Sequence, residues 1–546
     1  MRLQEIALSQ KSGLLDMYLH DRDFVQSFYE YDPWQEESVQ KRARYLEQTG
    51  RIIDRAYVVK ALRAFHQPEL MHPEVVRNLN RLGEDGSMVV IGGQQAGLLG
   101  GPLYTFYKAI TIIRLARQAE EQLGKPVIPV FWIAGEDHDI DEVDHIWVQT
   151  GGGEPCKHRL LVQDQRKLPV SERIIDKSVY NRWLDELAQI VPDSEYKQSW
   201  LTQCKTWGDT SLSWTRLFAR VLHHFFGKYG LLLVDSNDEN LRRIEIPFFD
   251  KLIRNSERIA RKTEQAACRL QKWDLDVPVD LKKNQGNLFI LADDERQHLF
   301  HENDDWVTKD GKHGWSVQEL LHLVSKEPAR FSNNVITRPL MQEALFPVLF
   351  FTGGPGEIAY WSLLKEAFLE VNLQMPIIVP RMRVTVIGSR QEKPIHEFSL
   401  NWRELDSSLR EKKKVWLNLQ KPPDLTQAFL EAEKRISAAH RQLVDYLDRE
   451  IGMNMMEVGE KNRAKIQAQI DYYYQFAWKS LEDRHRASLR KWDQLINFVQ
   501  PNDKPQERVY NMVWLWNEHG MEWIDFLINQ PDMPIKGYRA PYLLSI

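Results

Sequence analysis

Cysteine is scarce in this chain of 546 residues, which contains only Cys156, Cys204 and Cys268. The three cysteines lie far apart and form no CxxC pair, which excludes a disulfide-stabilised scaffold and a zinc site made of thiolates. So few cysteines are typical of a protein that works in a reducing compartment, and we therefore expect a cytoplasmic location.

A basic excess and a long apolar run are also missing. Lys and Arg number 72 against 77 Asp and Glu, which gives a net charge of −5, so the chain lacks the basic surface that nucleic-acid binding requires. Apolar runs such as Phe346–Phe351 are far too short to cross a bilayer. The first residues have no apolar core followed by a cleavage site, so no signal peptide is expected. We predict neither a nucleic acid nor a membrane as a partner.

The region 88–135 indicates the architecture of the first part of the chain. Residues 88–93 are apolar, residues 105–124 have the periodicity of an amphipathic helix that ends at Gly124, and residues 127–135 are apolar again. This order predicts a β-α-β unit with a right-handed crossover in a parallel sheet, and hence an α/β fold. Further strands are expected at 230–238, 344–357 and 375–388.

The length predicts two or three domains, and the sequence pattern divides the chain into three parts. An α/β core covers residues 1–390, with insertions at about 151–228 and 261–330. An α-helical coiled-coil domain covers 391–503, where glycines become rare, and a C-terminal helix and tail cover 504–546.

Apolar residues in the coiled-coil region recur in steps of four and three. The first seam consists of Leu425, Phe429, Ala432, Ile436, Ala439, Leu443 and Tyr446. The second consists of Ile466, Ile470, Tyr473, Ala477 and Leu481, continued by Leu489, Trp492 and Ile496. Two long helices joined by a turn at 451–454 predict an antiparallel hairpin that can also pair between subunits to give a homodimer. The alternative is an ordinary helical layer of the core.

Small residues and glutamines follow the first predicted strand in the sequence GGQQAGLLGGPLYTFYKA, Gly92–Ala109. Backbone N–H groups at Gly100 and Gly101 are candidates to approach phosphates, and Lys108 lies one turn inside the helix. Gln94 and Gln95 are candidates to hydrogen-bond a polar substrate. The spacing is neither GxGxxG nor a Walker loop. The alternatives are a turn that needs flexible glycines and a lysine on the surface.

Carboxylates and histidines crowd the end of the next predicted strand in FWIAGEDHDIDEVDH, Phe131–His145. Ligands usually bind at this edge of a parallel sheet. His138 is a candidate general base or orienting group, and Asp137 and Asp139 are candidates to bind an amine or Mg²⁺. Adjacent residues in an extended segment alternate in direction, so no closed local metal cage is predicted and no residue is assigned as a metal ligand. The later carboxylates fit a solvated helical turn.

Two further stretches supply candidates. Gly353, Gly354 and Gly356 lie in FTGGPGEIAYW (Phe351–Trp361), a second strand-to-helix turn that could close the same pocket or merely start a helix. Arg381 and Arg383 are two residues apart on a strand-like run, so we expect both to point one way toward a carboxylate or phosphate. The alternative is a pair of surface arginines. Weaker candidates, just before a strand, are Asn333, Arg338 and Gln342.

These motifs together, with the coiled coil, resemble the bacillithiol biosynthesis cysteine-adding enzymes, the cysteine ligases, over nearly the whole chain. The resemblance implies a cytoplasmic enzyme that joins cysteine to glucosaminyl-malate in the last step of bacillithiol biosynthesis. It also implies a Rossmann-like core related to class I aminoacyl-tRNA synthetases and pantothenate synthetases, a dimerising coiled coil and a bound adenine nucleotide. The HIGH and KMSKS motifs of those larger relatives are not present, so either Tyr104 or Thr105 replaces the HIGH histidine or the chemistry differs.

We therefore expect an ATP-dependent ligase that activates the cysteine carboxylate, with ATP or ADP as the nucleotide and Mg²⁺ as a possible metal. The expected catalytic residues are His138, Asp137, Asp139, Tyr104 and Lys108. The expected substrate-binding residues are Gln94, Gln95, Gly101, Asn333 and Arg338. The expected nucleotide-binding residues are Gly100, Gly353, Gly354, Gly356, Arg381 and Arg383. The alternatives are a nucleotide-binding transferase acting on another acid and amine, and a coiled-coil scaffold with a vestigial core.

Overall fold

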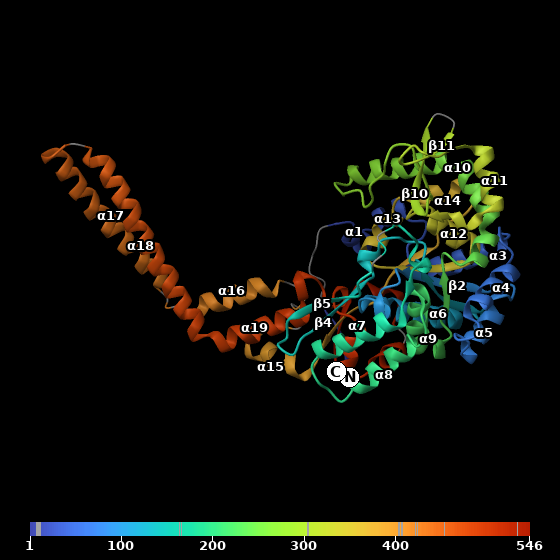
Figure 1. Ribbon diagram of the computed structural model, residues 1–546, viewed down its shortest axis with the longest axis horizontal. Helices are drawn as coiled ribbons and strands as arrows, with labels where there is room; N and C mark the ends of the chain where they lie inside the picture. The colour runs from blue at the N-terminus through green and yellow to red at the C-terminus, as the bar shows by residue number, and fades with distance from the viewer. Residues whose placement is uncertain are drawn as a thin grey trace. The chain divides into compact units, whose positions relative to one another are not determined.

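The computed structural model describes residues 1–6, 13–162, 164, 166–302, 305–401, 405, 408–420, 422, 424–452, 454–531 and 533–546. The chain divides into two compact units, which are described separately (Figure 1). The first unit combines Met1–Gly388 with Pro501–Ile546, and the second is Ser389–Gln500. The C-terminal segment therefore belongs to the same unit as the N-terminal region.

A five-stranded parallel sheet forms the centre of the first unit, as the sequence predicted. Its strands, in spatial order, are β15 (Ile377–Pro380), β14 (Val348–Gly353), β2 (Met88–Gln94), β3 (Val127–Ile133) and β8 (Leu232–Asp235). The chain runs from β2 outward to β3 and β8, and then returns to the other side of β2 for β14 and β15. The sheet thus has the strand order of a doubly wound Rossmann-like fold, with its topological switch point between β2 and β14.

Helix α6 (Tyr104–Leu123) connects β2 to β3 and packs against both strands. It ends at Gly124, whose φ of 63° is left-handed, as the sequence predicted. The long helix α10 (Glu239–Lys272) follows β8 and is capped by the preceding Asp238, whose side chain accepts hydrogen bonds from two backbone amides of the first turn. The N-terminal helices are α1 (Leu14–His20), α2 (Arg22–Phe28), α3 (Glu36–Gln48), α4 (Arg55–His66) and α5 (Pro73–Leu82).

The predicted single strand at 375–388 is wrong, because two strands of different sheets occupy it. β15 belongs to the parallel sheet, whereas β16 (Arg383–Ile387) pairs with β17 (Pro541–Ser545), which in turn pairs with β1 (Arg2–Glu5). The break follows Pro380, where the amide of Met382 leaves the sheet to donate to Thr111 Oγ1 at 2.9 Å. The two ends of the chain are joined in this second sheet.

An antiparallel sheet makes up most of the later insertion. Its strands, in spatial order, are β12 (Gly314–Ser316), β11 (Asp305–Thr308), β10 (Glu295–Glu302), β9 (Gln285–Ala292) and β13 (Phe331–Asn333). Helix α11 (Val317–Lys326) joins β12 to the segment before β13, and α12 (Thr337–Leu345) leads from β13 into β14. Strand β13 therefore ties this sheet to the parallel sheet.

The earlier insertion is a hairpin followed by helices. Its elements are β4 (His145–Gln149), β5 (Pro155–Arg159), β6 (Ile174–Ile175), α7 (Lys177–Ile190), α8 (Lys197–Trp207), β7 (Leu212–Ser213) and α9 (Trp214–Phe226). The remaining helices of the first unit are α13 (Pro355–Trp361), α14 (Lys365–Glu370), α20 (Met512–His519) and α21 (Glu522–Ile528).

The second unit is helical and contains the predicted antiparallel hairpin. Its helices are α15 (Ser389–Glu397), α16 (Leu409–Gln420), α17 (Leu425–Glu450), α18 (Met455–Arg484) and α19 (Arg486–Val499). Phe429 near the start of α17 lies beside Tyr474 late in α18, with ring centroids 5.1 Å apart. Toward the turn, His440 Nε2 and Asn462 Oδ1 lie 3.0 Å apart, so the two helices run in opposite directions.

The predicted first seam is wrong beyond Phe429 for the packing within the hairpin, whereas Ile466, Ile470, Ala477 and Leu481 of the predicted second seam are at least partly buried. Ile436, Leu443 and Tyr446 are 39%, 55% and 53% exposed, while His440 and Val444 contact α18 instead. Helix α17 has an apolar row on a face that α18 does not cover. The second seam is also not one helix, because α18 ends at Arg484 and α19 begins at Arg486. Within the described residues, no helix is long and apolar enough to cross a membrane.

Candidate functional site

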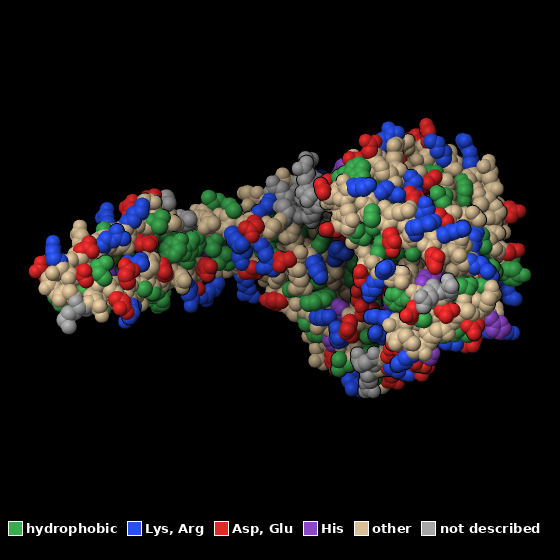
Figure 2. All heavy atoms as spheres, turned by 90° about the horizontal axis from the view of Figure 1, so that it is seen from above, with side chains coloured by type: hydrophobic (Ala, Val, Ile, Leu, Met, Phe, Trp, Pro, Cys, Tyr) green, Lys and Arg blue, Asp and Glu red, His purple; other side chains and the backbone are tan. Residues whose placement is uncertain are grey.

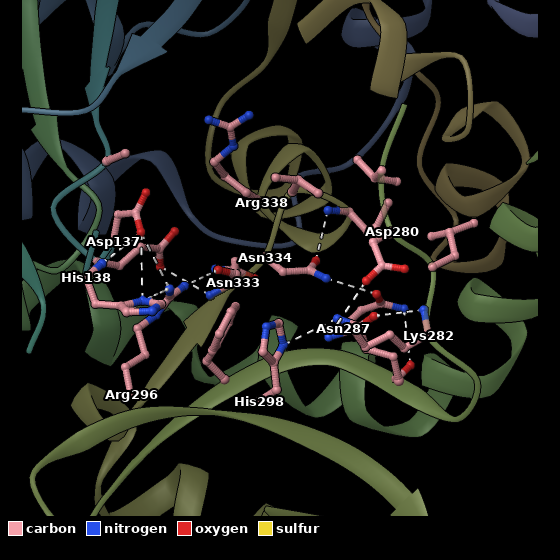
Figure 3. A pocket seen from close by; sticks show the side chains of 18 residues that line it. Asp137, His138, Asp280, Lys282, Asn287, Arg296, His298, Asn333, Asn334 and Arg338 are labelled. Carbon is pink, nitrogen blue, oxygen red and sulfur yellow. Dashed lines mark hydrogen bonds and ion pairs between the residues drawn. The ribbon is translucent and has the colours of Figure 1, made fainter. Parts of the chain in front are cut away.

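A pocket of about 420 Å³ lies beyond the carboxyl end of β3, where the antiparallel sheet faces the parallel sheet (Figure 3). Its volume is within the range of about 300–1,000 Å³ that is usual for ligand sites. Its polar lining residues are Glu136, Asp137, His138, Asp280, Lys282, Gln285, Asn287, Arg296, His298, Asn333, Asn334 and Arg338. The pocket therefore collects four of the predicted residues, Asp137, His138, Asn333 and Arg338, from segments far apart in the sequence.

Glu136 connects the two walls of this pocket. Its carboxylate Oε2 pairs with the fully buried Arg242 of α10 and accepts a hydrogen bond from the backbone amide of Asn333 at 3.2 Å. Arg242 also pairs with Glu245 at 2.7 Å. Burial of two carboxylates is stable only with such partners. Glu136 therefore has a structural role: it joins the end of β3 to the end of β13.

Asp137 is a charged acceptor at the edge of the pocket. It accepts hydrogen bonds from Gln95 Nε2 and from the backbone amide of His138, each at 2.8 Å. Burial raises the pKa of the Asp137 carboxyl, but the Gln95 hydrogen bond and the charge of Arg296 outweigh this, so the net shift is downward. Asp139, by contrast, is exposed and does not line the pocket.

His138 lies beside Arg296, which sequence reasoning did not identify. The Arg296 Nη1 is 3.1 Å from His138 Nδ1, and its guanidinium carbon is 3.5 Å from the centroid of the Phe289 ring. Burial lowers the pKa of His138, and the positive charge of Arg296 lowers it further. Both effects favour the neutral imidazole.

Asn333 has an unusual environment for a buried amide. Its side chain lines the pocket, the residue is 1% exposed, and neither Nδ2 nor Oδ1 has a hydrogen-bond partner among the described residues. An unpaired buried amide costs about 1–3 kcal/mol, so such a group in a pocket is a strong candidate to bind a ligand. Arg338 in the first turn of α12 contacts the hydroxyl of Tyr360, and its Nε has no partner among the described residues.

Lys108 does not lie in this pocket but at the switch point between β2 and β14. Its Nζ donates to the carbonyl of Gly93, to Gln94 Oε1 at 3.1 Å and to Glu357 of α13. Burial lowers its pKa, and the carboxylate of Glu357 offsets part of the shift. The interpretation of Lys108 as a surface lysine is wrong, since it is completely buried.

The other predicted polar residues near the switch point also have protein partners. Tyr104 accepts a hydrogen bond from Gln94 Nε2 at 3.4 Å, and burial raises its pKa. The guanidinium of Arg381 lies 5.2 Å from the centroid of the Tyr104 ring and donates to Glu507 at 2.7 Å. Arg383 instead donates to the carbonyl of Arg539. The expectation that Arg381 and Arg383 point one way along a single strand is therefore wrong, because Arg381 lies in the connection between β15 and β16, Arg383 begins β16, and the two bind different partners.

The predicted phosphate-binding glycines form tightly packed turns. Gly100 and Gly101 have φ of 84° and 70°, and their amides donate to the carbonyls of Gly97 and Leu98 at 3.1 and 2.9 Å. These amides therefore cannot cradle a phosphate in this conformation, which corrects the expectation. Gly353 ends β14, the amide of Gly354 donates to Glu357 at 2.9 Å, and Gly356 is exposed in the first turn of α13.

Sequence reasoning missed the wall that the antiparallel sheet supplies. Gln285, Asn287 and Phe289 alternate along β9, and Arg296 and His298 alternate along β10, so each set shares one face of the sheet. This period-two pattern was a usable signal for the strands. The pattern does not reveal that the antiparallel sheet packs over the carboxyl end of the parallel sheet. Among the described residues, no group of three His, Cys, Asp or Glu side chains is arranged to hold a metal ion.

Comparison with known proteins gives matches along both units. Residues 1–382 match the model of the bacillithiol biosynthesis BshC N-terminal Rossmann-like domain, and residues 384–538 match its C-terminal coiled-coil domain. A relative from Lysinibacillus sphaericus is 34% identical over 97% of this chain and 98% of its own length. Another from Halalkalibacterium halodurans is 33% identical over the full length of both chains. Both carry the name "Putative cysteine ligase BshC".

Proposed function

The chain belongs to the BshC family of bacillithiol biosynthesis, and on that premise we propose that it is a cytoplasmic ligase that joins cysteine to glucosaminyl-malate through an amide bond. The name of its full-length relatives supports the ligase activity. The observation that carries the proposal for the site is the pocket beyond β3, where the buried side-chain amide of Asn333 has no partner among the described residues.

The proposed substrates fit the polar groups of the pocket. The charged carboxylate of Asp137 can accept an N–H of the sugar amine, while Arg338 and the Asn333 amide can bind carboxylate or hydroxyl oxygens. Arg296 and Lys282 add positive charge on the side of the antiparallel sheet. A pocket with both signs of charge suits an amine and a carboxylate bound side by side.

Amide formation from a free carboxylate is unfavourable in water, so we propose ATP as the co-substrate that activates cysteine, with Mg²⁺ on its phosphates. The residues predicted to hold the nucleotide do not fit that role in this conformation. The amides of Gly100 and Gly354 and the guanidinium of Arg381 already bind protein groups. The geometry of these residues therefore does not locate the ATP.

The test of the ligase activity is a reconstitution with purified protein, cysteine, glucosaminyl-malate, ATP and Mg²⁺, with bacillithiol detected by thiol labelling and mass spectrometry. We expect bacillithiol only when all components are present. Cysteine-dependent exchange of labelled pyrophosphate into ATP would support an adenylate, and bacillithiol without exchange would support an acyl phosphate. Product with another acid or amine but not with glucosaminyl-malate would favour a different transferase.

We also propose that the hairpin of the second unit forms a homodimer. Ile436, Leu443 and Tyr446 of α17 and Tyr472, Tyr473 and Phe476 of α18 are exposed. Figure 2 shows apolar side chains among the charged ones on this hairpin. Burying such a row against a second copy removes it from water.

The dimer is tested with Leu443→Lys combined with Ile436→Lys, and with Gln442→Lys as the exposed polar control. Sedimentation should give a dimer for the wild type and the control but a monomer for the double variant, with equal helix content by circular dichroism. A double variant that sediments as the wild type does would refute the proposed interface.

A further inference from the structure

Arg296 is one of the most firmly held side chains of the pocket. Its guanidinium stacks on Phe289 of β9 and donates from Nε to Ser332 Oγ at 2.9 Å and from Nη2 to the carbonyl of Asn333 at 2.7 Å. The residue is 7% exposed. Partners on β9 and β13 thus fix the plane of the guanidinium, and Nη1 is left to face His138.

The contact between Arg296 and His138 determines which imidazole nitrogen carries the proton. A guanidinium has only donors, so His138 Nδ1 must be the acceptor at 3.1 Å. Asp137 Oδ1, which would favour a proton on Nδ1, is 3.8 Å away and already accepts from the backbone amide of His138. A neutral imidazole has one N–H, and that proton must then be on Nε2.

We propose that Arg296 is a positioning residue that fixes His138 as the Nε2–H tautomer, so that the ring offers an N–H donor to an oxygen of the ligand. The ligand group is a carboxylate, carbonyl or hydroxyl oxygen. This replaces the general-base role expected for His138, because the nitrogen that could take up a proton is occupied by Arg296. The tautomer of His138 does not depend on the proposed function. The effect of the tautomer on the reaction rests on the proposed function.

Solid-state ¹⁵N NMR of the full-length protein labelled at histidine tests the tautomer directly. The His138 signals are identified by their loss in His138→Gln. We expect a protonated Nε2 and an unprotonated Nδ1 at neutral pH in the wild type. A protonated Nδ1 would overturn the proposal, whatever the variants do.

Two arginine variants test the role of Arg296 in the same spectra. Arg296→Met removes the donor to Nδ1, and we expect a mixture of tautomers or Nδ1–H. Arg330→Met is the control, because Arg330 donates to the carbonyl of Leu291 on the same sheet and should leave the His138 signals unchanged. A folded Arg296→Met protein with wild-type His138 signals would show that Arg296 does not set the tautomer.

Two variants of His138 distinguish a hydrogen-bond donor from a general base in the ligase assay. A glutamine can place an N–H near the position of Nε2 but cannot act as a base. We expect His138→Ala to lose about 100-fold in kcat, in line with the loss of one donor to a developing charge. His138→Gln should stay within about tenfold of the wild type, and equal losses in the two variants would overturn the donor role. A wild type with no ligase activity would refute the proposed function and leave the NMR result standing.

Discussion

Two groups of buried polar side chains lie at the carboxyl edge of the parallel sheet, and they differ in how their hydrogen bonds are used. At the switch point, Lys108 has a partner for each of its three N–H groups, one of them Glu357. In the pocket, the side-chain amide of Asn333 has no partner among the described residues. Buried polar groups are normally paired. The fully paired Lys108 therefore holds elements of the fold together, whereas the unpaired side-chain amide of Asn333 is available to a ligand.

The largest expected effect concerns the satisfied side of this comparison. Lys108→Met leaves Glu357 without its cation, and removing one partner of a buried ion pair should reduce the free energy of unfolding by about 3 kcal/mol. Urea denaturation followed by circular dichroism measures this. The exposed Lys283→Met is the control and should change the free energy of unfolding by no more than about 0.5 kcal/mol. A loss below about 1 kcal/mol for Lys108→Met would mean that the Lys108–Glu357 ion pair contributes little to the stability of the fold.

His66 is a second buried side chain whose polar atoms are paired, and its pairing makes stability depend on pH. His66 Nδ1 faces the carbonyl of Leu62 at 2.7 Å, and its Nε2 accepts from the amide of Leu233 in β8 at 3.1 Å. Burial lowers the pKa of His66 from 6.5 to about 4. The unfolded chain therefore takes up a proton between these values that the folded chain does not, and stability falls as pH decreases through this window.

The expected loss from His66 between pH 7 and pH 4 is about 3 kcal/mol in the free energy of unfolding. It is measured by denaturation at several pH values for the wild type and His66→Gln, with the exposed His322→Gln as control. The His66 variant should have the flatter pH dependence. If the free energy of unfolding had the same pH dependence in all three proteins, His66 would not be the source of the loss.

The smallest effect on stability is expected in the pocket. Asn333→Leu removes an unpaired amide, so the free energy of unfolding should fall by less than about 1 kcal/mol or should rise. Asn78 is the matched control, because its amide donates to the carbonyl of Gly230 at 2.8 Å and accepts from Arg81 at 3.2 Å. Asn78→Leu should lose about 1–3 kcal/mol. Equal losses would erase the distinction between the two groups.

The sequence was sufficient for elements that local pattern specifies. The strand at 88–94, helix α6 and its end at Gly124 follow from apolar periodicity and a left-handed glycine. The position of Asp137 and His138 at the edge of the sheet also follows, because they come four and five residues after the end of β3 at Ile133. Long-range features did not follow: the break between Arg381 and Arg383 depends on pairing with β17, which lies at the far end of the chain.

The same limit applies to the site and to the coiled coil. Arg296 reaches His138 only because the antiparallel sheet folds over the end of β3, and nothing local to residue 296 indicates this contact. The missing partners of Asn333 are a property of the folded environment and not of its neighbours in sequence. In α17, apolar residues occupy more than one face, so the repeat alone did not show that Leu443 faces away from α18.

If the unpaired polar groups of the pocket bind the substrate, the Asn333 side-chain amide must contribute to its affinity. Isothermal titration of glucosaminyl-malate into the wild type and into Asn333→Leu measures this contribution. We predict saturable binding to the wild type and at least about tenfold weaker binding to the variant, which corresponds to about 1.4 kcal/mol. Equal affinity for a stable, folded Asn333→Leu protein would contradict the claim.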